Sequence, residues 1–195
     1  MTSHWGPLGW MTLHSASMLY PENPEPAERM LMEYFINLFG ETISCFTCKT
    51  HFITMKKKYV SWNPGYLNSK KEFMLFVFRA HNTVNKKLDK PILYSVKDCI
   101  TTLKNANSYS SLDSMRNAYL IYLQNNWNKE LSADGFSMRK KIQELFKINN
   151  DYFNKRTIDW DYTFEENVLL SIEEKTPVFQ TRKKLGGFKN GKLLL

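Results

Sequence analysis

Residues 70–91 read KKEFMLFVFRAHNTVNKKLDKP, and the spacing of their apolar side chains indicates a helical fold for the N-terminal half of the chain. Its large apolar side chains recur every three or four residues from Phe73 to Leu88, which predicts an amphipathic helix that ends before Pro91. His81, Val84 and Asn85 are spaced to share one face of it. That face fits a pocket for a large polar heteroaromatic ligand. It equally fits a core in which His and Asn satisfy each other.

Apolar residues on both sides of this helix also recur at helical spacing. We expect four more helices before residue 105, at about 10–20, 27–39, 44–59 and 96–103. Gly40 is expected to end the second of them, and Ser44 to cap the third. No segment alternates with period two for long enough to predict a strand. The first hundred residues therefore predict an all-α bundle.

The second half of the chain has weaker patterns. A polar linker is expected at Asn105–Ser111, followed by helices at 112–127 and 137–153. The acidic segment 160–172 is ambiguous, and the basic ending is expected to be a mobile tail. We therefore expect three parts: a bundle at 1–104, a mainly helical extension of unknown role at 105–181, and a tail at 182–195.

The composition limits the classes of partner. The chain has 195 residues and a formal net charge of +8, but much of the excess lies in the last fifteen residues and none of it forms an arginine-rich stripe. A nucleic-acid interface is therefore not expected. The N-terminus lacks the charged and apolar stretches of a signal peptide, and no run approaches the roughly 20 apolar residues of a membrane span.

Two of the three cysteines form a Cys45-Phe-Thr-Cys48 motif at the expected start of a helix. This spacing brings two thiols close enough for an easily exchanged disulfide. The helix dipole and the unpaired amides of the first turn would lower the thiol pKa and favour the reactive thiolate. The pair therefore predicts redox chemistry, and Cys99 is left without an intrachain partner.

A metal site is the alternative for the same pair. His51 completes a Cys-x2-Cys-x2-His pattern, and Cys99 or His81 would supply a fourth ligand in a zinc-stabilised helical binding module. A haem attachment requires His where Lys49 stands. A thioredoxin-like site requires a preceding strand, whereas residues 32–39 have a helical pattern.

Four motifs occur together in one order along the chain: Gly6-Pro-Leu-Gly9-Trp10-x3-His14, Tyr20-Pro21, Cys45-x2-Cys48, and His81-Asn-x-Val-Asn-Lys-x-Leu-x-Lys-Pro91. In this combination the sequence resembles the Erv/ALR family of FAD-linked sulfhydryl oxidases, from Trp5 to about Pro91. The resemblance implies that 1–104 is a four-helix bundle that binds FAD, with a short fifth helix across it, and that two copies form a homodimer.

The resemblance also implies which residues would contact FAD. By motif match they are Gly6, Gly9, Trp10, His14, Tyr20, His81, Asn82, Val84, Asn85, Lys87 and Lys90. The lysines would neighbour the phosphates, and the two glycines would let the backbone approach closely. The flavin of this family does not lie on a Rossmann sheet, so the absence of a Gly-x-Gly-x-x-Gly motif is expected.

The mechanism implied by the resemblance makes Cys45 and Cys48 the catalytic pair. A substrate thiolate would attack Cys45, and Cys48 would pass electrons to FAD, which oxygen reoxidises to give hydrogen peroxide. Many relatives carry a second, shuttling cysteine pair, which this chain lacks. Its electrons would therefore come directly from thiol-containing proteins, with a thioredoxin-like donor as one candidate. Such compact members are typical of large DNA viruses, which suggests the host cytoplasm and the virion as locations.

Overall fold

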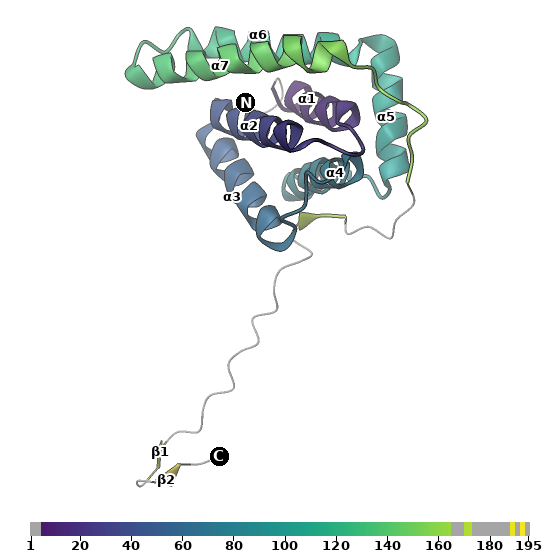
Figure 1. Cartoon of the computed structure of the whole chain (residues 1–195). Coiled ribbons are helices and arrows are strands. Elements are labelled where there is room, and N and C mark those ends of the chain that lie inside the picture. Colours follow the sequence, from purple (N-terminus) through teal and green to yellow (C-terminus); the bar gives the residue numbers. More distant parts are fainter. Residues whose placement is uncertain (1–4, 165–169, 173–187, 190–191, 194–195) are drawn as a thin grey trace.

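The computed structural model describes residues 5–164, 170–172, 188–189 and 192–193. Seven helices form the body of this part of the chain (Figure 1). They are α1 (Trp5–Leu19), α2 (Pro26–Thr42), α3 (Phe46–Trp62), α4 (Lys70–Lys87), α5 (Val96–Tyr109), α6 (Leu112–Trp127) and α7 (Ala133–Asp151), followed by the short 3-10 helix η1 (Phe153–Lys155). The predicted all-α class is confirmed.

The basic C-terminal tail contains the strands of the structure. The pair β1 (Phe188–Lys189) and β2 (Lys192–Leu193) is antiparallel, with Phe188 opposite Leu193. The rest of the expected mobile tail at 182–195 lies outside the described residues.

The predicted end of the second helix was wrong. α2 continues through Gly40 to Thr42, because Gly40 is where α2 and α3 come into close contact. A Cβ atom at Gly40 would lie only 2.9 Å from Cδ1 of Phe52. The glycine therefore permits helix packing at this position instead of ending a helix.

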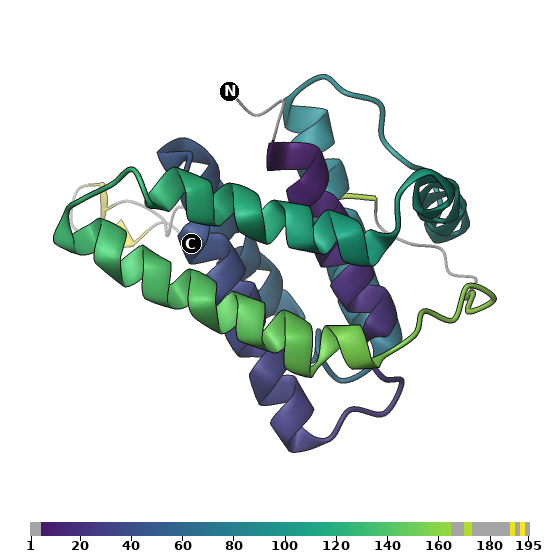
Figure 2. The same ribbon diagram turned by 90° about the horizontal axis from the view of Figure 1, so that it is seen from above.

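α1 is the central helix of the bundle. Its side chains are buried continuously from Thr12 to Leu19, so neighbours surround it on every side. α4 packs along one side of α1 and α6 along another (Figures 1 and 2). The main core contains buried residues from both ends of the chain, among them Leu13, Ile36, Phe73, Phe76, Tyr119, Leu123 and Leu145.

The buried polar groups of α1 are hydrogen-bonded, as burial requires. Thr12 Oγ1 donates to the Leu8 carbonyl at 2.8 Å, and Ser17 Oγ donates to the His14 carbonyl at 2.8 Å. Ser15 Oγ accepts from Arg116 of α6. The first two bonds lie within α1 and satisfy its own hydroxyls. The Ser15–Arg116 bond joins α1 to α6 and therefore fixes which side of α1 faces that helix.

The predicted linker at Asn105–Ser111 was wrong over most of its length. α5 runs to Tyr109 and so passes through the expected boundary at 104/105. The side of α5 that carries Val96, Ile100 and Leu103 packs in a second cluster with residues of α1 and α4. Leu103 is the last buried residue of this face. The polar turns beyond it stay helical through their own backbone hydrogen bonds, which end where the Ser110 amide donates to the Ala106 carbonyl at 3.1 Å.

α6 and α7 form a hairpin that lies across α1 and α2 (Figures 1 and 2). α6 packs on α1 and α7 packs on α2. The bounds of α6 agree with the prediction, whereas α7 begins four residues earlier than expected, at Ala133, because Ser132 caps it by accepting from the Gly135 amide. In the described part of the chain, this extension therefore shares one core with the bundle.

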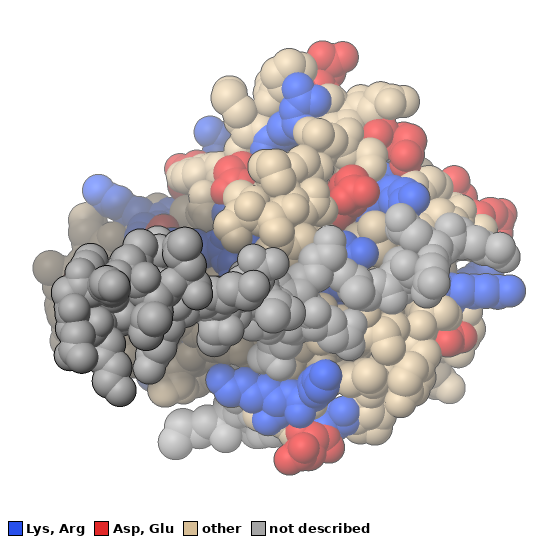
Figure 3. Space-filling view, turned by 90° about the horizontal axis from the view of Figure 1, so that it is seen from below, with Lys and Arg blue, Asp and Glu red and all other residues tan. Residues whose placement is uncertain are grey.

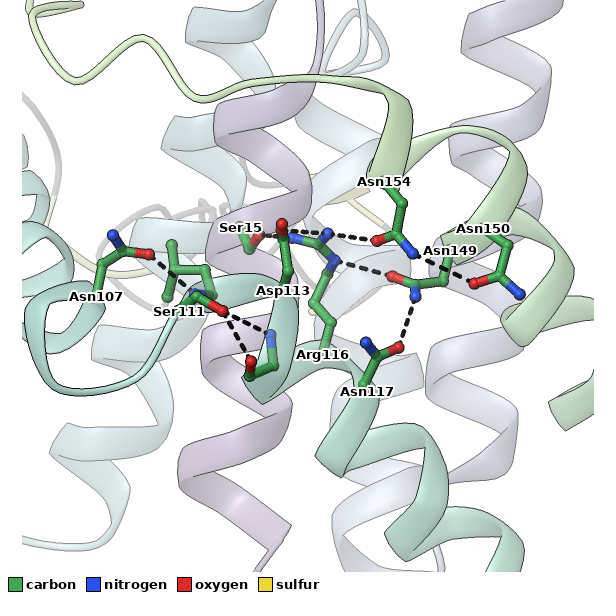
Figure 4. Close-up of polar contacts among 11 residues, drawn as sticks. Ser15, Asn107, Ser111, Asp113, Arg116, Asn117, Asn149, Asn150 and Asn154 are labelled. Atoms are coloured by element: carbon green, nitrogen blue, oxygen red, sulfur yellow. Dashed lines mark hydrogen bonds and ion pairs between the residues drawn. The ribbon is translucent and has the colours of Figure 1, made fainter.

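Arg116 joins α6 to its neighbours (Figure 4). Its side chain is only 1% exposed, and its guanidinium donates to Ser15 Oγ, to Asn149 Oδ1 at 2.9 Å and to Asn154 Oδ1 at 3.1 Å. Its ion-pair partner is Asp113, at 2.6 Å, whose side chain is 60% exposed. The planar fork of donors thus ties α6 to α1, α7 and η1 at one point.

The segment after η1 returns along the bundle. Arg156 pairs with Glu28 at 2.5 Å, and the Tyr162 hydroxyl donates to Glu22 at 2.7 Å. The Ile172 amide donates to Thr83 Oγ1 of α4 at 2.9 Å. Apolar side chains of this segment cover the second cluster: Ile158, Trp160, Tyr162, Phe164 and Leu170. The described part of the ambiguous segment 160–172 is therefore a connecting segment packed on α4 and α5.

We expect Arg116→Ala to lower the free energy of unfolding by about 3 kcal/mol, because it leaves the buried amide oxygen of Asn149 and the buried hydroxyl of Ser15 without their donor. Urea denaturation followed by circular dichroism measures the change. Lys147→Ala, at an exposed position of α7, is the control and should stay within about 0.5 kcal/mol. Equal stability of the two variants would contradict the role assigned to Arg116.

Candidate redox and cofactor site

Cys45 and Cys48 are joined by a disulfide at the start of α3, with their Cα atoms 5.2 Å apart. The helix cap differs from the prediction: Cys45, and not Ser44, is the N-cap residue. Its Sγ accepts from the Cys48 amide at 3.3 Å. Once the disulfide is reduced, this amide and the positive end of the helix dipole would stabilise a thiolate at Cys45.

The disulfide is accessible from one side. Both cysteines are half-buried, while Phe46 between them is 79% exposed. Thr47 is also exposed, and its Oγ1 lies 3.3 Å from Cys45 Sγ. A thiol of another protein can therefore approach Cys45 over the turn that carries Phe46 and Thr47.

Three predicted cofactor residues, Trp10, His14 and His81, lie together where α1 packs against α4. The indole of Trp10 stacks on the imidazole of His81, with ring centroids 4.4 Å apart and an interplanar angle of 10°. His14 Nε2 lies 3.0 Å from His81 Nδ1. The structure thus brings together two motifs that are separated by 67 positions in the sequence, and they form an aromatic and imidazole face.

Both imidazoles are neutral at neutral pH. Burial lowers the pKa of His14 well below its usual value, and the nearby His81 lowers it further. Burial also lowers the pKa of His81 to about 4, with a further contribution from the positive charge of Lys90. The face therefore offers hydrogen bonds and stacking without a full charge.

The other residues of the α4 motif divide between the face and its support. Val84 and Asn85 are half-buried one turn beyond His81, whereas Lys87 and Lys90 are exposed. Asn82 is buried and exchanges two hydrogen bonds with the Leu93 backbone, at 2.8 and 3.1 Å. The Asn82 amide thus holds the segment that leads to α5, a role that its place in the motif did not reveal.

Three predicted residues lie elsewhere on α1 or just beyond it. A Cβ at Gly6 would meet nothing within 4 Å, so the backbone there is open to approach, while Gly9 is buried. Tyr20 is 0% exposed and its hydroxyl donates to the Leu67 carbonyl at 2.9 Å. The structure therefore places Tyr20 in the bundle interior and does not bring it to the Trp10–His81 face.

The sequence did not single out Cys99 as a neighbour of this face. Its Sγ lies 3.7 Å from His14 Nδ1, on the side of His14 opposite His81. The helical spacing of Val96, Cys99, Ile100 and Leu103 was the available signal, because it puts the thiol on the apolar side of α5. That pattern predicts burial but does not identify the partner.

The donor set of the zinc alternative is not assembled. Within the residues that the structure describes, no group of three or more His, Cys, Asp and Glu side chains is placed to hold a metal ion. The sulfurs of Cys45 and Cys48 are bonded to each other, and Cys99 faces His14 instead of this pair.

The residues present fit a flavin nucleotide better than a metal. A stacked aromatic face with neutral imidazoles suits a planar heteroaromatic ring, and the exposed Lys87 and Lys90 at the end of α4 suit phosphates. On the face shown in Figure 3, Lys and Arg side chains occur at several places with Asp and Glu among them. No described helix is both long and apolar enough to cross a membrane.

Comparison with known proteins agrees with a flavin site in this bundle. A family model described as "Erv1 / Alr family" matches residues 8–105. An FAD-linked sulfhydryl oxidase of African swine fever virus is 34% identical over 90 residues, which cover 46% of this chain and 72% of the viral protein. The mitochondrial FAD-linked sulfhydryl oxidase ERV1 of Saccharomyces cerevisiae is 35% identical over 86 residues, 44% of this chain and 43% of the yeast protein. The FAD-linked sulfhydryl oxidase ERV2 of the same yeast is 31% identical over 100 residues, 51% and 47% of the two chains.

The lowered pKa of His81 predicts how stability depends on pH. The unfolded chain binds a proton at this residue below about pH 6.5, whereas the folded chain does so only near pH 4. Acid therefore favours unfolding. The stabilisation that comes from keeping His81 neutral is lost as the pH falls from 6.5 to 4.

We expect the free energy of unfolding of His81→Gln to fall less between pH 7 and 4.5 than that of the wild type, by about 1–2 kcal/mol. Urea titrations at four or five pH values measure how the free energy of unfolding depends on pH in both proteins. The same pH dependence in the two proteins would contradict a neutral, buried His81.

Proposed function

The chain belongs to the Erv1/Alr family, and on this premise we propose that it is an FAD-linked thiol oxidase that forms disulfide bonds in protein substrates. The observation that carries the proposal is the accessible Cys45–Cys48 disulfide at the start of α3. The Trp10–His81 face supports it, because the bundle that carries the disulfide also provides a stacking surface for a planar cofactor.

The first step is thiol–disulfide exchange at Cys45. A substrate thiolate forms a bond to Cys45 Sγ while the Cys45–Cys48 bond breaks and Cys48 leaves as a thiolate. The second substrate thiol then displaces Cys45, so the substrate is oxidised to a disulfide and the cysteine pair is reduced. The Cys48 amide near Cys45 Sγ and the first turn of α3 stabilise the thiolates that this exchange releases.

FAD, when bound, supplies the acceptor for the two electrons of the reduced pair and the chemistry with oxygen that gives hydrogen peroxide. We propose that Trp10, His14, His81, Val84 and Asn85 bind its ring system and that Lys87 and Lys90 lie near its phosphates. Gly6 and Gly9 complete the proposed contacts on α1. Asn82 contributes by fixing the segment before α5, and Tyr20 by packing α1 against the bundle.

We propose that the electrons come directly from thiol-containing proteins. The chain has three cysteines, so it has no second pair to act as a shuttle. A thioredoxin-like protein is one candidate donor, and molecular oxygen is the final acceptor. The viral relative supports a viral origin, for which we propose the host cytoplasm and the virion as locations.

A homodimer is also proposed, with a constraint on its geometry. α6 covers one face of α1, and α7 covers one face of α2. Two copies would therefore have to meet through other surfaces of the bundle, because these faces are occupied by the chain's own extension.

The activity is tested with dithiothreitol as the thiol. We expect the purified protein to carry flavin absorbance and to consume oxygen, and Cys48→Ser to lower the rate at least about 100-fold while keeping the flavin. Ser137→Ala, at an exposed position of α7, is the control. A colourless protein that contains one zinc ion would instead support the metal-stabilised binding module.

The order of attack is tested by trapping. In Cys48→Ser, a peptide with one thiol activated as a mixed disulfide should attach to Cys45 and stay there, because no second cysteine can release it. Mass spectrometry of a tryptic digest locates the adduct. Labelling of Cys48 in Cys45→Ser at an equal rate would contradict the assignment of Cys45 as the accessible thiol.

A further inference from the structure

A buried thiol lies behind the two histidines of the site. Cys99 is 4% exposed, and α5 carries it into the second cluster beside Met18, Leu75 and Phe78. Its Sγ lies 3.7 Å from His14 Nδ1. This polar contact within an otherwise apolar cluster is not used by the proposed exchange chemistry.

The three groups form a continuous line of contacts toward the cofactor face. Cys99 Sγ faces His14 Nδ1, and His14 Nε2 lies 3.0 Å from His81 Nδ1. His81 stacks on Trp10, and the contact with His14 uses its Nδ1, which leaves Nε2 as the nitrogen for a ligand. The line thus links a buried thiol to one atom of the proposed cofactor site.

Proton counting allows two arrangements of this line. Each neutral imidazole carries one N–H, so the contact between His14 and His81 contains one shared proton. If His14 donates from Nε2, its Nδ1 must accept from Cys99, and His81 then presents Nε2–H. If His81 donates from Nδ1, then His14 Nδ1–H points at the sulfur, and His81 presents a bare Nε2.

The chemistry of the thiol selects between them. Burial raises the pKa of Cys99 to about 12, so the sulfur keeps its proton. A thiol is a weak donor and thiol sulfur is a weak acceptor, whereas an imidazole nitrogen is a good acceptor. The S–H···N bond is therefore favoured over N–H···S, and it fixes the proton positions of both imidazoles in turn.

We propose that Cys99 is a positioning residue: its S–H bond to His14 makes His14 donate to His81, and His81 Nε2–H is then a hydrogen-bond donor for an acceptor atom of the bound flavin nucleotide. The proposal rests on the proposed function for the identity of the ligand. The line of proton donors itself depends only on Cys99, His14 and His81.

The direct test is nitrogen NMR of the flavin-loaded protein with 15N-labelled histidine. The chain has four histidines. The signal that disappears in His4→Gln and the one that disappears in His51→Gln are assigned first, and the two remaining signals belong to His14 and His81. We expect both His14 and His81 to carry their proton on Nε2. A proton on Nδ1 of His81 would overturn the proposal.

Three variants separate the donor from its packing. Cys99→Ser keeps a donor of similar size, and we expect its FAD dissociation constant to stay within about 2-fold of the wild-type value. Cys99→Ala removes the donor, and we expect FAD to bind about 3- to 10-fold more weakly, with mixed histidine tautomers. Ile100→Val, a small truncation in the same helix and cluster, is the packing control.

The outcomes separate the positioning role of Cys99 from the proposed function of the chain. Equal losses of FAD affinity in Cys99→Ala and Ile100→Val, without a change of tautomer, would overturn the positioning role. A wild-type protein that cannot be loaded with FAD would contradict the proposed function. In that case the tautomers measured on the flavin-free chain still decide whether Cys99 orders the two histidines.

Discussion

The burial of α1 is the constraint on which the rest of the structure depends. From Thr12 to Leu19 this helix has no exposed side, yet it carries several polar side chains, and each must find a partner inside the protein. Ser15 is paired with Arg116 of α6, and His14 with α4 and α5. One helix therefore couples the C-terminal extension to the cofactor face, because neighbouring positions of α1 point toward the two.

This coupling gives a structural role to the part of the chain outside the family match. The extension supplies α6 and α7, whose apolar residues complete the main core, and a returning segment that covers the cluster around Cys99. Arg116 makes the attachment specific, because its donors fit only one placement of α6 against Ser15, Asn149 and Asn154. The redox bundle is thus held from two sides by residues that follow it in the sequence.

The sequence predicted what depends on local spacing. Helical periodicity located α4 and α6 almost to the residue. The resemblance to the Erv/ALR family, and not local spacing, implied that Trp10 and His81 belong to one site, and the structure brings the two rings together. The predicted helix ends were wrong at two places. α2 continues through Gly40, where Phe52 of α3 packs closely against it, and α5 extends past residue 104. Asn82 and Cys99 were likewise beyond reach, since their partners Leu93 and His14 are set by tertiary packing.

Electron transfer from the cysteine pair to a flavin held by α1 and α4 is the step on which the proposed function depends. Anaerobic absorbance spectroscopy with a stoichiometric dithiol tests it most directly. We expect the absorbance band of oxidised flavin to bleach in the wild type and to persist in Cys48→Ser. A wild-type flavin that stays oxidised, while alkylation shows Cys45 and Cys48 fully reduced, would contradict this electron transfer.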